Sequence, residues 1–446
     1  MRPNVLFLVI DSFRADKCYG SKKTSVTPNL DYLIQNGIYF SQMISSAPAS
    51  IPAVSSILTG LFPFKSLSLE NDVYNLKKDI PNIIGILKNS GYETIATIPN
   101  ILKLMNLNHI FNEINSYDDQ STLYDGIGEK ILEKFDNLIN NEPWVYYLHL
   151  NDIHGQAIFH KDFFHDDFND VKLGKNQYER MVSLMDPWIG KILKRVNLSN
   201  TLIILTADHG SDVASFDSEM EKISKSAKEK LVIEKNFSIK TGQKITSKLP
   251  KFFNPLRRNL SKKYRAKRTS IVEKQISPVL DKIESEEQDP YKKRLLKNML
   301  KASTLPFDEK FRIPLIFSGY GVDSHHITSQ QIRSVDIFPT ILDLLGIENN
   351  YQIHGKSLMN YFTGKPTIEQ PAYIESHKNV NEGIFKNLVG IRTSKFKYFR
   401  SKDDPSQDLH LYDLESDPLE IKNIANDDKK TISSMESLIK KIQTSI

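Results

Sequence analysis

The amino-acid sequence predicts an α/β protein with a mostly parallel central sheet flanked by helices. Three short runs, Val5 to Ile10, Trp144 to Leu150 and Thr201 to Thr206, are rich in apolar residues along their whole length. Such runs are typical of strands that are buried on both faces of a parallel sheet. Segments long enough for helices separate these runs, as βαβ units require. With 446 residues, the chain can bury a substantial core around this sheet.

Further elements follow from local signals. Amphipathic helices are predicted for Thr27 to Ile34, which opens near Pro28, and for Ile80 to Ser90, which Gly91 stops. Three more elements are predicted: strands at Thr94 to Ile98 and Ile313 to Ser318, and a helix at Val335 to Leu345.

The alternation of strands and helices breaks between residues 212 and 305. This stretch is rich in lysine, contains no strong strand signal and carries prolines between polar helical patches. We therefore expect a catalytic domain over 1–370 that is interrupted by a helical or partly disordered insertion at 212–305. Residues 371–446 read as a small antiparallel subdomain closed by a C-terminal helix.

Positive charge is concentrated in that insertion. Residues 221–270 contain sixteen Lys and Arg but three acids, whereas the whole chain carries +5, so the remainder is acidic. The segment 245–270 mixes these cations with Phe252 and Phe253, a combination that favours peripheral contact with an anionic membrane surface. A solvated helical hairpin is the alternative, and nucleic acid is a weaker one because no recognition fold accompanies the charge.

Composition also bears on the compartment. The single cysteine, Cys18, excludes a disulfide within the chain. No run reaches the roughly 20 apolar residues that a bilayer span needs. The first apolar run follows Met1-Arg2-Pro3 almost at once, so we expect no cleavable signal. We expect a cytoplasmic protein, peripheral at the membrane if the basic segment binds lipid.

Polar side chains follow the predicted strands at their carboxyl ends. Asp11 comes directly after the first strand, Asp208 and His209 follow Thr201 to Ala207, and His154 lies four residues beyond Leu150. In an open α/β sheet, sites form outside the carboxyl ends of the strands. Two carboxylates and an imidazole there suit one divalent cation, Mn²⁺, Ca²⁺, Mg²⁺ or Zn²⁺. Each residue alone is also typical of a turn or a helix cap.

Ser50 is predicted to lie at the N-terminus of a helix. Pro52 suits the first turn, and Gly60 is a signal for the C-terminal end. The free amides of a helix N-terminus favour an anionic group that is being transferred. Ser50 is equally suited to be a simple helix cap.

The chain resembles the sulfatase family of the alkaline phosphatase superfamily. The landmarks that carry the resemblance occur in family order and cover nearly the whole chain outside the basic insertion. They are Asn4 to Asp11 with Arg14-Ala-Asp16, Thr27 to Asp31, Gly37 to Phe40, Ser50-x-Pro52 with Leu58-Thr-Gly60, Thr206 to Gly210, Arg312 to Leu315, Asp336 to Thr340, Gly355 to Leu358 and Leu411 to Pro418.

The resemblance implies an alkaline-phosphatase-like fold and a role for each candidate residue. Ser50 would be the nucleophile and, with Asp11, Asp208 and His209, a metal ligand. His154 resembles the histidine that protonates the leaving oxygen; a histidine that binds a loop backbone is the alternative. The resemblance places Lys301 roughly where the family has a substrate lysine, although a surface lysine fits equally.

The sequence departs from the family at three points. Val54 occupies the arginine position of the pattern that directs conversion of Ser or Cys to formylglycine, so we expect Ser50 to stay unmodified. The paired aspartates are reduced to Asp11-Ser12. The Gly-Lys-Trp-His motif is absent; Asn100 could bind the transferred group in its place, or simply form a turn.

These features predict a metal-dependent hydrolase or phosphotransferase that attacks a sulfate or phosphate ester with Ser50. Attack on phosphorus would leave a phosphoserine that water or an acceptor hydroxyl can take over, whereas a sulfated serine has no easy exit. Chemistry therefore slightly favours phosphate mono- or diesters, lipid- or glycan-linked ones included, and family resemblance favours sulfate. A catalytically silent sulfatase-fold protein, acting as a binding or membrane-surface partner, is the alternative.

Overall fold

The computed structural model describes residues 2–70, 73–138, 143–154, 168, 170–215, 220, 277–278, 280–281, 283–300, 305–365, 367–376 and 387–446. Its contacts divide the chain into two compact units. The first contains Met1–Ala214, Pro306–Glu375 and Leu388–Ile446, and the second contains Ser215–Leu305 and Ser376–Asn387. Lys301 and the whole basic segment 245–270 lie outside the described residues.

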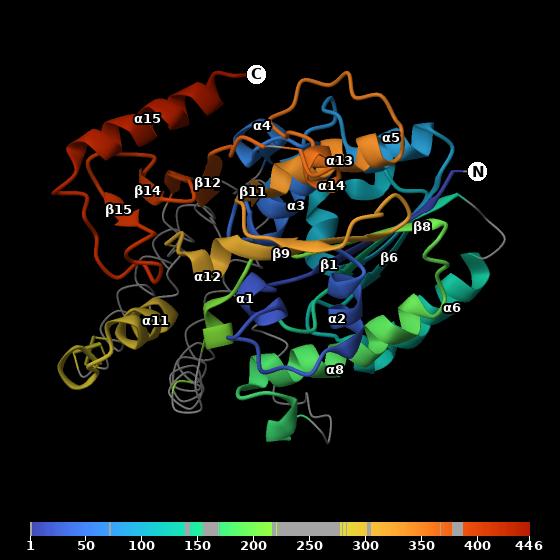
Figure 1. Cartoon of the computed structure of the whole chain (residues 1–446), viewed down its shortest axis with the longest axis horizontal. Coiled ribbons are helices and arrows are strands. Elements are labelled where there is room, and N and C mark those ends of the chain that lie inside the picture. The colour runs from blue at the N-terminus through green and yellow to red at the C-terminus, as the bar shows by residue number, and fades with distance from the viewer. Residues whose placement is uncertain are drawn as a thin grey trace, which may run out of the picture. The chain divides into compact units, whose positions relative to one another are not determined.

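A nine-stranded sheet is the centre of the first unit (Figure 1). Its strands are β1 (Asn4–Ile10), β2 (Gly37–Ile44), β5 (Glu93–Pro99), β6 (Glu113–Tyr117), β7 (Trp144–Leu150), β8 (Thr201–Thr206), β9 (Arg312–Gly319), β10 (His326–Thr328) and β11 (Ile332–Arg333). They run in the order β10-β2-β9-β8-β1-β7-β5-β6, and β11 pairs with β2. Strand β9 is antiparallel to both of its neighbours, β2 and β8, and the other pairs are parallel. The predicted α/β fold with a mostly parallel sheet is confirmed.

Helices cover both faces of this sheet (Figure 1). On one face lie α2 (Pro28–Gln35), α6 (Gly128–Leu138) and α8 (Gln177–Leu193), and on the other lie α3 (Ser50–Thr59), α5 (Ile83–Asn89) and α13 (Ile337–Leu344). Every residue of β1, β7 and β8 is buried between these layers. This two-sided burial explains why the three strands are apolar at nearly every position.

Two predicted helices are shorter than expected. The helix expected at 80–90 begins at Ile83, because the Asn82 side chain caps it by accepting a hydrogen bond from the Gly85 N–H at 2.6 Å. The helix expected at Val335 to Leu345 starts as a 3₁₀ turn at Ser334–Asp336 and becomes α-helical at Ile337.

The first unit also contains a small antiparallel sheet near the C-terminus, as predicted. It consists of β12 (Ala372–Ser376), β13 (Leu388–Arg392), β14 (Phe396–Ser401) and β15 (His410–Asp413), in that order. Helix α15 (Lys429–Gln443) packs Met435 and Ile439 into the apolar cluster of this sheet. Within the second unit, the structure describes α11 (Pro290–Leu300).

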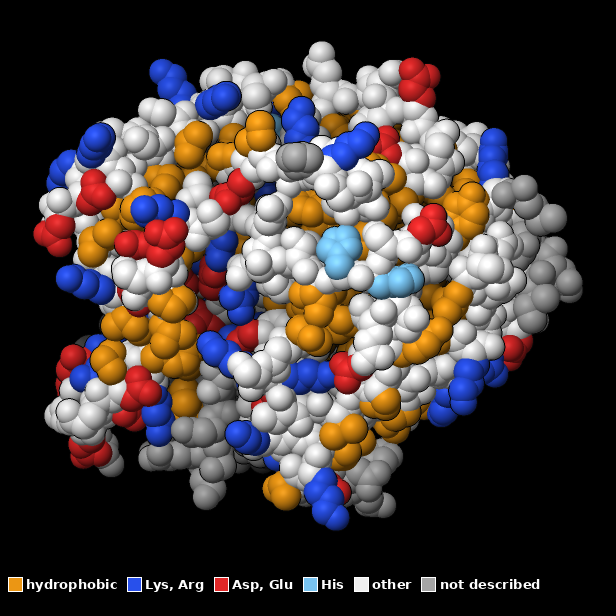
Figure 2. All heavy atoms as spheres, in the orientation of Figure 1, with side chains coloured by type: hydrophobic (Ala, Val, Ile, Leu, Met, Phe, Trp, Pro, Cys, Tyr) orange, Lys and Arg blue, Asp and Glu red, His pale blue; other side chains and the backbone are white. Residues whose placement is uncertain are grey.

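Two further features are the charge on one face of the molecule and the character of the helices. Charged side chains of both signs are interspersed on the face shown in Figure 2. Among the residues described, no helix has the length and apolar character needed to cross a membrane.

The register of the central strands places the site. Val9 of β1 lies beside His149 of β7 and Thr206 of β8, so the carboxyl ends of the three strands lie side by side. The residues that follow β1, β7 and β8 are therefore neighbours in space although they are far apart in the sequence.

Candidate active site

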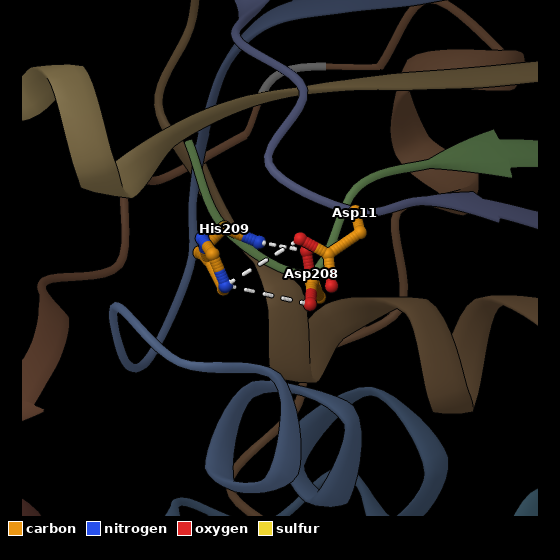
Figure 3. Close-up of side chains that lie close together, drawn as sticks. All are labelled: Asp11, Asp208 and His209. Atoms are coloured by element: carbon orange, nitrogen blue, oxygen red, sulfur yellow. Dashed lines mark hydrogen bonds and ion pairs between the residues drawn. The ribbon is translucent and has the colours of Figure 1, made fainter. Parts of the chain in front are cut away.

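A buried cluster of two carboxylates and one imidazole lies at the carboxyl ends of β1 and β8 (Figure 3). Asp11, Asp208 and His209 each offer one ligand atom within 4.8 Å of the others. Nε2 of His209 is 3.6 Å from Oδ2 of Asp208 and 3.9 Å from Oδ1 of Asp11. The structure thus brings together the three residues that the sequence placed after two separate strands.

Ser50 joins this cluster from the first turn of α3. Its hydroxyl donates a hydrogen bond of 3.0 Å to Oδ2 of Asp11. The N-cap of α3 is Ala49, and no side chain caps the helix. Gly60 ends the helix in the left-handed conformation, at φ 67°. Ser50 is therefore the first residue of the helix rather than its cap, and its hydroxyl faces the carboxylate cluster.

His154 lies at the edge of the cluster. It follows β7 in a turn in which its N–H donates to the Asn151 carbonyl, and its Nε2 is 4.0 Å from Oδ1 of Asp11. Its side chain remains 30% exposed, unlike the buried carboxylate beside it. A histidine between the cluster and solvent can exchange protons with both a bound group and water.

His149 is a site residue that the sequence analysis missed. Its side chain is fully buried, and its Nε2 lies 3.4 Å from Oδ2 of Asp11 and 3.7 Å from Oδ2 of Asp208. Its Nδ1 forms a hydrogen bond of 3.2 Å with the Tyr147 hydroxyl. His149 is the second-to-last residue of an apolar strand, where the pattern predicts only core. Its place in the site follows from the pairing of β7 with β1, which sets His149 beside Val9, two residues before Asp11. The residues of β7 themselves carry no signal for it.

The carboxylates lie in an unusual electrostatic environment. Within the described part of the chain, Asp11 and Asp208 form ion pairs with histidines and with no Lys or Arg. Burial opposes ionisation of Asp11, but the charge of His154 and the hydrogen bond from His149 outweigh it and hold the pKa of Asp11 well below its ordinary value. Burial lowers the pKa of His209, but the charges of Asp208 and Asp11 outweigh it, so that its pKa is raised.

The donor set fits a divalent cation. Oδ2 of Asp208 is buried and has no hydrogen-bond partner, although a buried carboxylate oxygen normally has one. Two carboxylates would neutralise a divalent charge, and carboxylate with imidazole is a common ligand set for Mn²⁺ and Zn²⁺. The residues that would hold the ion are Asp11, Asp208, His209 and, through its hydroxyl, Ser50.

Of the two predicted substrate-binding residues, only Asn100 lies in the described part of the chain, and it is not part of this cluster. Asn100 is exposed at the start of the 3₁₀ helix η1 (Asn100–Met105) and forms no hydrogen bond with the site residues named above. The role of Lys301 stays a prediction, because that residue is outside the described ranges.

Comparisons with known proteins identify the family of the chain. The family model "Sulfatase" matches residues 3–347, and the model "N-sulphoglucosamine sulphohydrolase, C-terminal" matches residues 302–445. An N-acetylglucosamine-6-O-sulfatase from Bacteroides thetaiotaomicron is 23% identical over 95% of this chain and 82% of its own length. Arylsulfatase K from Gallus gallus is 29% identical over 30% of this chain, and the match spans about a quarter of that relative (26%).

Solved structures share the fold. One protein, solved in complex with its substrate D-glucosamine-2-N,6-O-disulfate, superposes with a TM-score of 0.66 at 17% identity, over 99% of this chain and 98% of that one. The phosphonate monoester hydrolase of Agrobacterium radiobacter superposes with a TM-score of 0.65 at 15% identity, over 99% and 95%. With a family model that matches residues 3–347 and this fold, the chain belongs to the sulfatase family.

Proposed function

We propose that the protein is a metal-dependent hydrolase of sulfate esters in which Ser50 is the nucleophile and His154 the general acid. One observation supports this most: the Ser50 hydroxyl, at the N-terminus of α3, lies 3.0 Å from a buried carboxylate that shares its site with Asp208 and His209. The resemblance to sulfatases over residues 3–347 supports sulfate as the group attacked.

In this proposal, Ser50 would attack the sulfur of the ester from the N-terminus of α3. The divalent cation, when bound, would lower the pKa of the Ser50 hydroxyl and draw electron density from the ester. Asp11 accepts the hydrogen bond of that hydroxyl and so fixes its direction. With its depressed pKa, Asp11 stays ionised and suits the role of ligand rather than of proton acceptor, so the proton of the Ser50 hydroxyl would pass to solvent water. After the alcohol has left, water would attack the sulfur of the sulfated Ser50, releasing hydrogen sulfate and restoring the serine hydroxyl; this is the slow step for an unmodified serine. The free amides of the first turn of α3 would stabilise the negative oxygens of the transferred group.

His154 would protonate the leaving alcohol in this proposal. When the bond to the alcohol breaks, the alkoxide oxygen needs a proton, and His154 is the partly exposed histidine beside Asp11. His149 and His209 are much more deeply buried, and their Nε2 atoms approach the carboxylates. Of the three histidines, His154 therefore has the best access to a substrate oxygen and to water.

A second candidate is hydrolysis or transfer of phosphate esters. It rests on Val54, which replaces the arginine of the formylglycine pattern and so favours an unmodified serine. An unmodified serine releases phosphate to water more readily than it releases sulfate. A phosphonate monoester hydrolase shares the fold, which is compatible with this chemistry but does not select it.

The alcohol half of the substrate is best sought among sulfated sugars. A relative that aligns with 95% of this chain is named as an N-acetylglucosamine-6-O-sulfatase, and one structural neighbour was solved with a disulfated glucosamine. We propose sulfated amino sugars, free or glycan-linked, as the first substrates to test.

The test is a panel of matched sulfate and phosphate esters of one sugar and one aryl alcohol, assayed with Mn²⁺, Zn²⁺, Mg²⁺ and Ca²⁺ in turn. Mass spectrometry of the Ser50 peptide after each incubation would show an added phosphate, an added sulfate or a formylglycine. Faster release from the sulfate esters supports the main proposal, and faster release from the phosphate esters supports the second. A metal-loaded protein that cleaves no ester would support the catalytically silent alternative.

A further inference from the structure

The residue after the first metal-ligand candidate has an unusual backbone conformation. Ser12 has φ 64°, in the left-handed region that glycine adopts easily and serine rarely, and it is only 3% exposed. A buried, strained residue persists only where its surroundings hold it, and such residues concentrate at functional sites.

In this conformation, Ser12 hydrogen-bonds both carboxylates of the cluster. Its hydroxyl donates to Oδ1 of Asp11 at 2.7 Å, and its backbone N–H donates to Oδ1 of Asp208 at 3.1 Å. One residue therefore bridges two ligand candidates that are 197 positions apart in the sequence. The bond to Asp11 leaves Oδ2 of that carboxylate to Ser50 and His149, and the bond to Asp208 leaves its Oδ2 without a hydrogen-bond partner.

The strained turn is anchored from α8. The hydroxyl of Tyr178, a fully buried residue, donates to the Ser12 carbonyl at 2.9 Å and accepts the Arg14 N–H at 3.2 Å. Carbonyl, amide and hydroxyl of Ser12 are therefore all hydrogen-bonded. Rotation of Ser12 back to a relaxed conformation would break at least one of these bonds.

We propose that Ser12 is a positioning residue that holds Asp11 and Asp208 in the geometry that a divalent cation needs. Two buried carboxylates repel one another before an ion binds, and hydrogen bonds from Ser12 offset that repulsion and fix which oxygens face the ion. At this position the sequence departs from the paired aspartates of the family, so Ser12 contributes hydrogen bonds to the ligands where a second carboxylate would be a ligand itself. The inference rests on the cation of the proposed function.

Isothermal titration of the metal-free full-length protein with Mn²⁺ alone tests this role. We compare Ser12→Ala, which removes the hydroxyl but keeps the strain, with Ser12→Gly, which removes both. Loss of an outer hydrogen-bond partner typically weakens metal affinity about 10- to 100-fold, and we expect both variants to fall in that range. Ser12→Gly should unfold at a higher temperature than Ser12→Ala, because glycine relieves the strain.

Ser183→Ala is the matched control. Ser183 is a buried serine of α8 whose hydroxyl accepts the Val26 N–H at 2.7 Å and donates to the Leu173 carbonyl at 2.5 Å. It should lose thermal stability but keep its Mn²⁺ affinity within about twofold. The electron paramagnetic resonance spectrum of bound Mn²⁺ should change in the Ser12 variants and stay that of the wild type in Ser183→Ala.

The outcomes separate the two proposals. If the wild type binds none of Mn²⁺, Zn²⁺, Mg²⁺ or Ca²⁺, the proposed function fails at its metal site. If the wild type binds Mn²⁺ and both Ser12 variants bind it within twofold with an unchanged spectrum, the inference about Ser12 is wrong and the proposed function stands. Should Ser12→Ala fail to fold, Ser12→Gly alone decides the question.

Discussion

Two buried clusters of charge in the first unit are built in opposite ways. In one, the carboxylate of Asp308 accepts hydrogen bonds from Arg392 at 2.9 Å and from Lys397 at 2.5 Å, and Lys397 also pairs with Glu420 at 2.9 Å. In the other, Asp11 and Asp208 lie beside histidines, and within the described residues no Lys or Arg forms an ion pair with them. Both clusters are largely buried, although the Asp308 side chain is 14% exposed, and only the first balances its negative charge with fixed positive charges.

The contrast separates a structural role from a binding role. Burial raises the pKa of Asp308, but Arg392 and Lys397 outweigh it and hold that pKa well below its ordinary value. The positive charges that neutralise this cluster are side chains of the protein itself, Arg392 and Lys397. At Asp208, Oδ2 has no hydrogen-bond partner, and in the described part of the chain only histidines lie in ion-pair range of it, so a bound divalent cation would complete this cluster. A buried carboxylate pair whose partners are histidines rather than Lys or Arg is therefore the better indicator of a ligand site.

Removal of the nucleophile should have the largest effect. We expect Ser50→Ala to lower kcat for any ester that the protein cleaves by about 10⁴-fold or more, because the Ser50 hydroxyl is the proposed nucleophile that forms the covalent intermediate. Its thermal stability should stay close to that of the wild type. Initial rates under saturating substrate measure the loss. Turnover within tenfold of the wild type would remove Ser50 from the mechanism.

The second-largest effect is expected in the balanced cluster. Asp308→Asn removes the shared partner of Arg392 and Lys397, and loss of one member of a buried ion pair costs about 3–5 kcal/mol of unfolding free energy. Urea unfolding of the metal-free protein measures this cost. A variant that is as stable as the wild type would mean that Arg392 and Lys397 find other partners. The structural role assigned to this cluster would then be wrong.

The same substitution should act in the opposite direction in the other cluster. Asp208→Asn keeps the Oδ1 acceptor for Ser12 and His209 but removes a charge that pairs with no Lys or Arg in the described part of the chain. We expect the metal-free variant to be more stable than the wild type by about 1 kcal/mol, and to bind Mn²⁺ at least about 100-fold more weakly. Urea unfolding and calorimetric titration give the two numbers. A loss of stability as large as that of Asp308→Asn would contradict the distinction.

The smallest predicted effect concerns Asp152, a buried carboxyl group that belongs to neither of the two clusters. Burial raises the pKa of Asp152 to about 7. The folded protein then keeps a proton that the unfolded chain loses near pH 4, so this stabilising contribution is complete below pH 4 and is lost as the pH rises to 7.

Asp152→Asn should remove the loss of stability at high pH, because asparagine does not ionise. Its side-chain oxygen can still accept the Leu123 N–H, which lies 2.9 Å from Oδ1 of Asp152. We expect the variant to gain about 1–3 kcal/mol over the wild type at pH 8, and much less at pH 4.5. Unfolding free energies at the two pH values decide this. An equal difference at both pH values would show that Asp152 does not titrate in this window.

The sequence was sufficient to predict the parts of the site that follow strand ends. An apolar run that stops at a charged residue shows where a buried strand ends, so Asp11, Asp208 and His209 could be identified as neighbours. Ser50 could be placed at a helix start because Pro52 and Gly60 are position-specific signals. Each of these inferences uses only residues within ten positions of the one inferred.

Residues whose role depends on distant partners could not be predicted in this way. His149 lies inside an apolar run, and only the pairing of β1 with β7 shows that it approaches Asp11. Ser12 has no side-chain signal for a left-handed conformation, which depends on Tyr178 of α8. The direction of β9, antiparallel between β2 and β8, also follows from the path of the chain and not from its own residues.

One backbone hydrogen bond beside the site has a consequence for how the chain can vary. The Gly210 N–H donates to the Lys310 carbonyl at 2.8 Å, and Nζ of Lys310 pairs with Asp212 at 3.0 Å. A Cβ at position 210 would lie 2.2 Å from the Glu309 carbonyl oxygen, so only glycine permits this approach. The chain leaves the first unit after residue 214 and re-enters it at 306. The contacts of Lys310 with Gly210 and Asp212 hold the two flanking segments together. Because the entropy of loop closure grows only with the logarithm of loop length, we expect that insertions of very different length could replace the segment between 214 and 306 without displacing Asp11, Asp208 and His209.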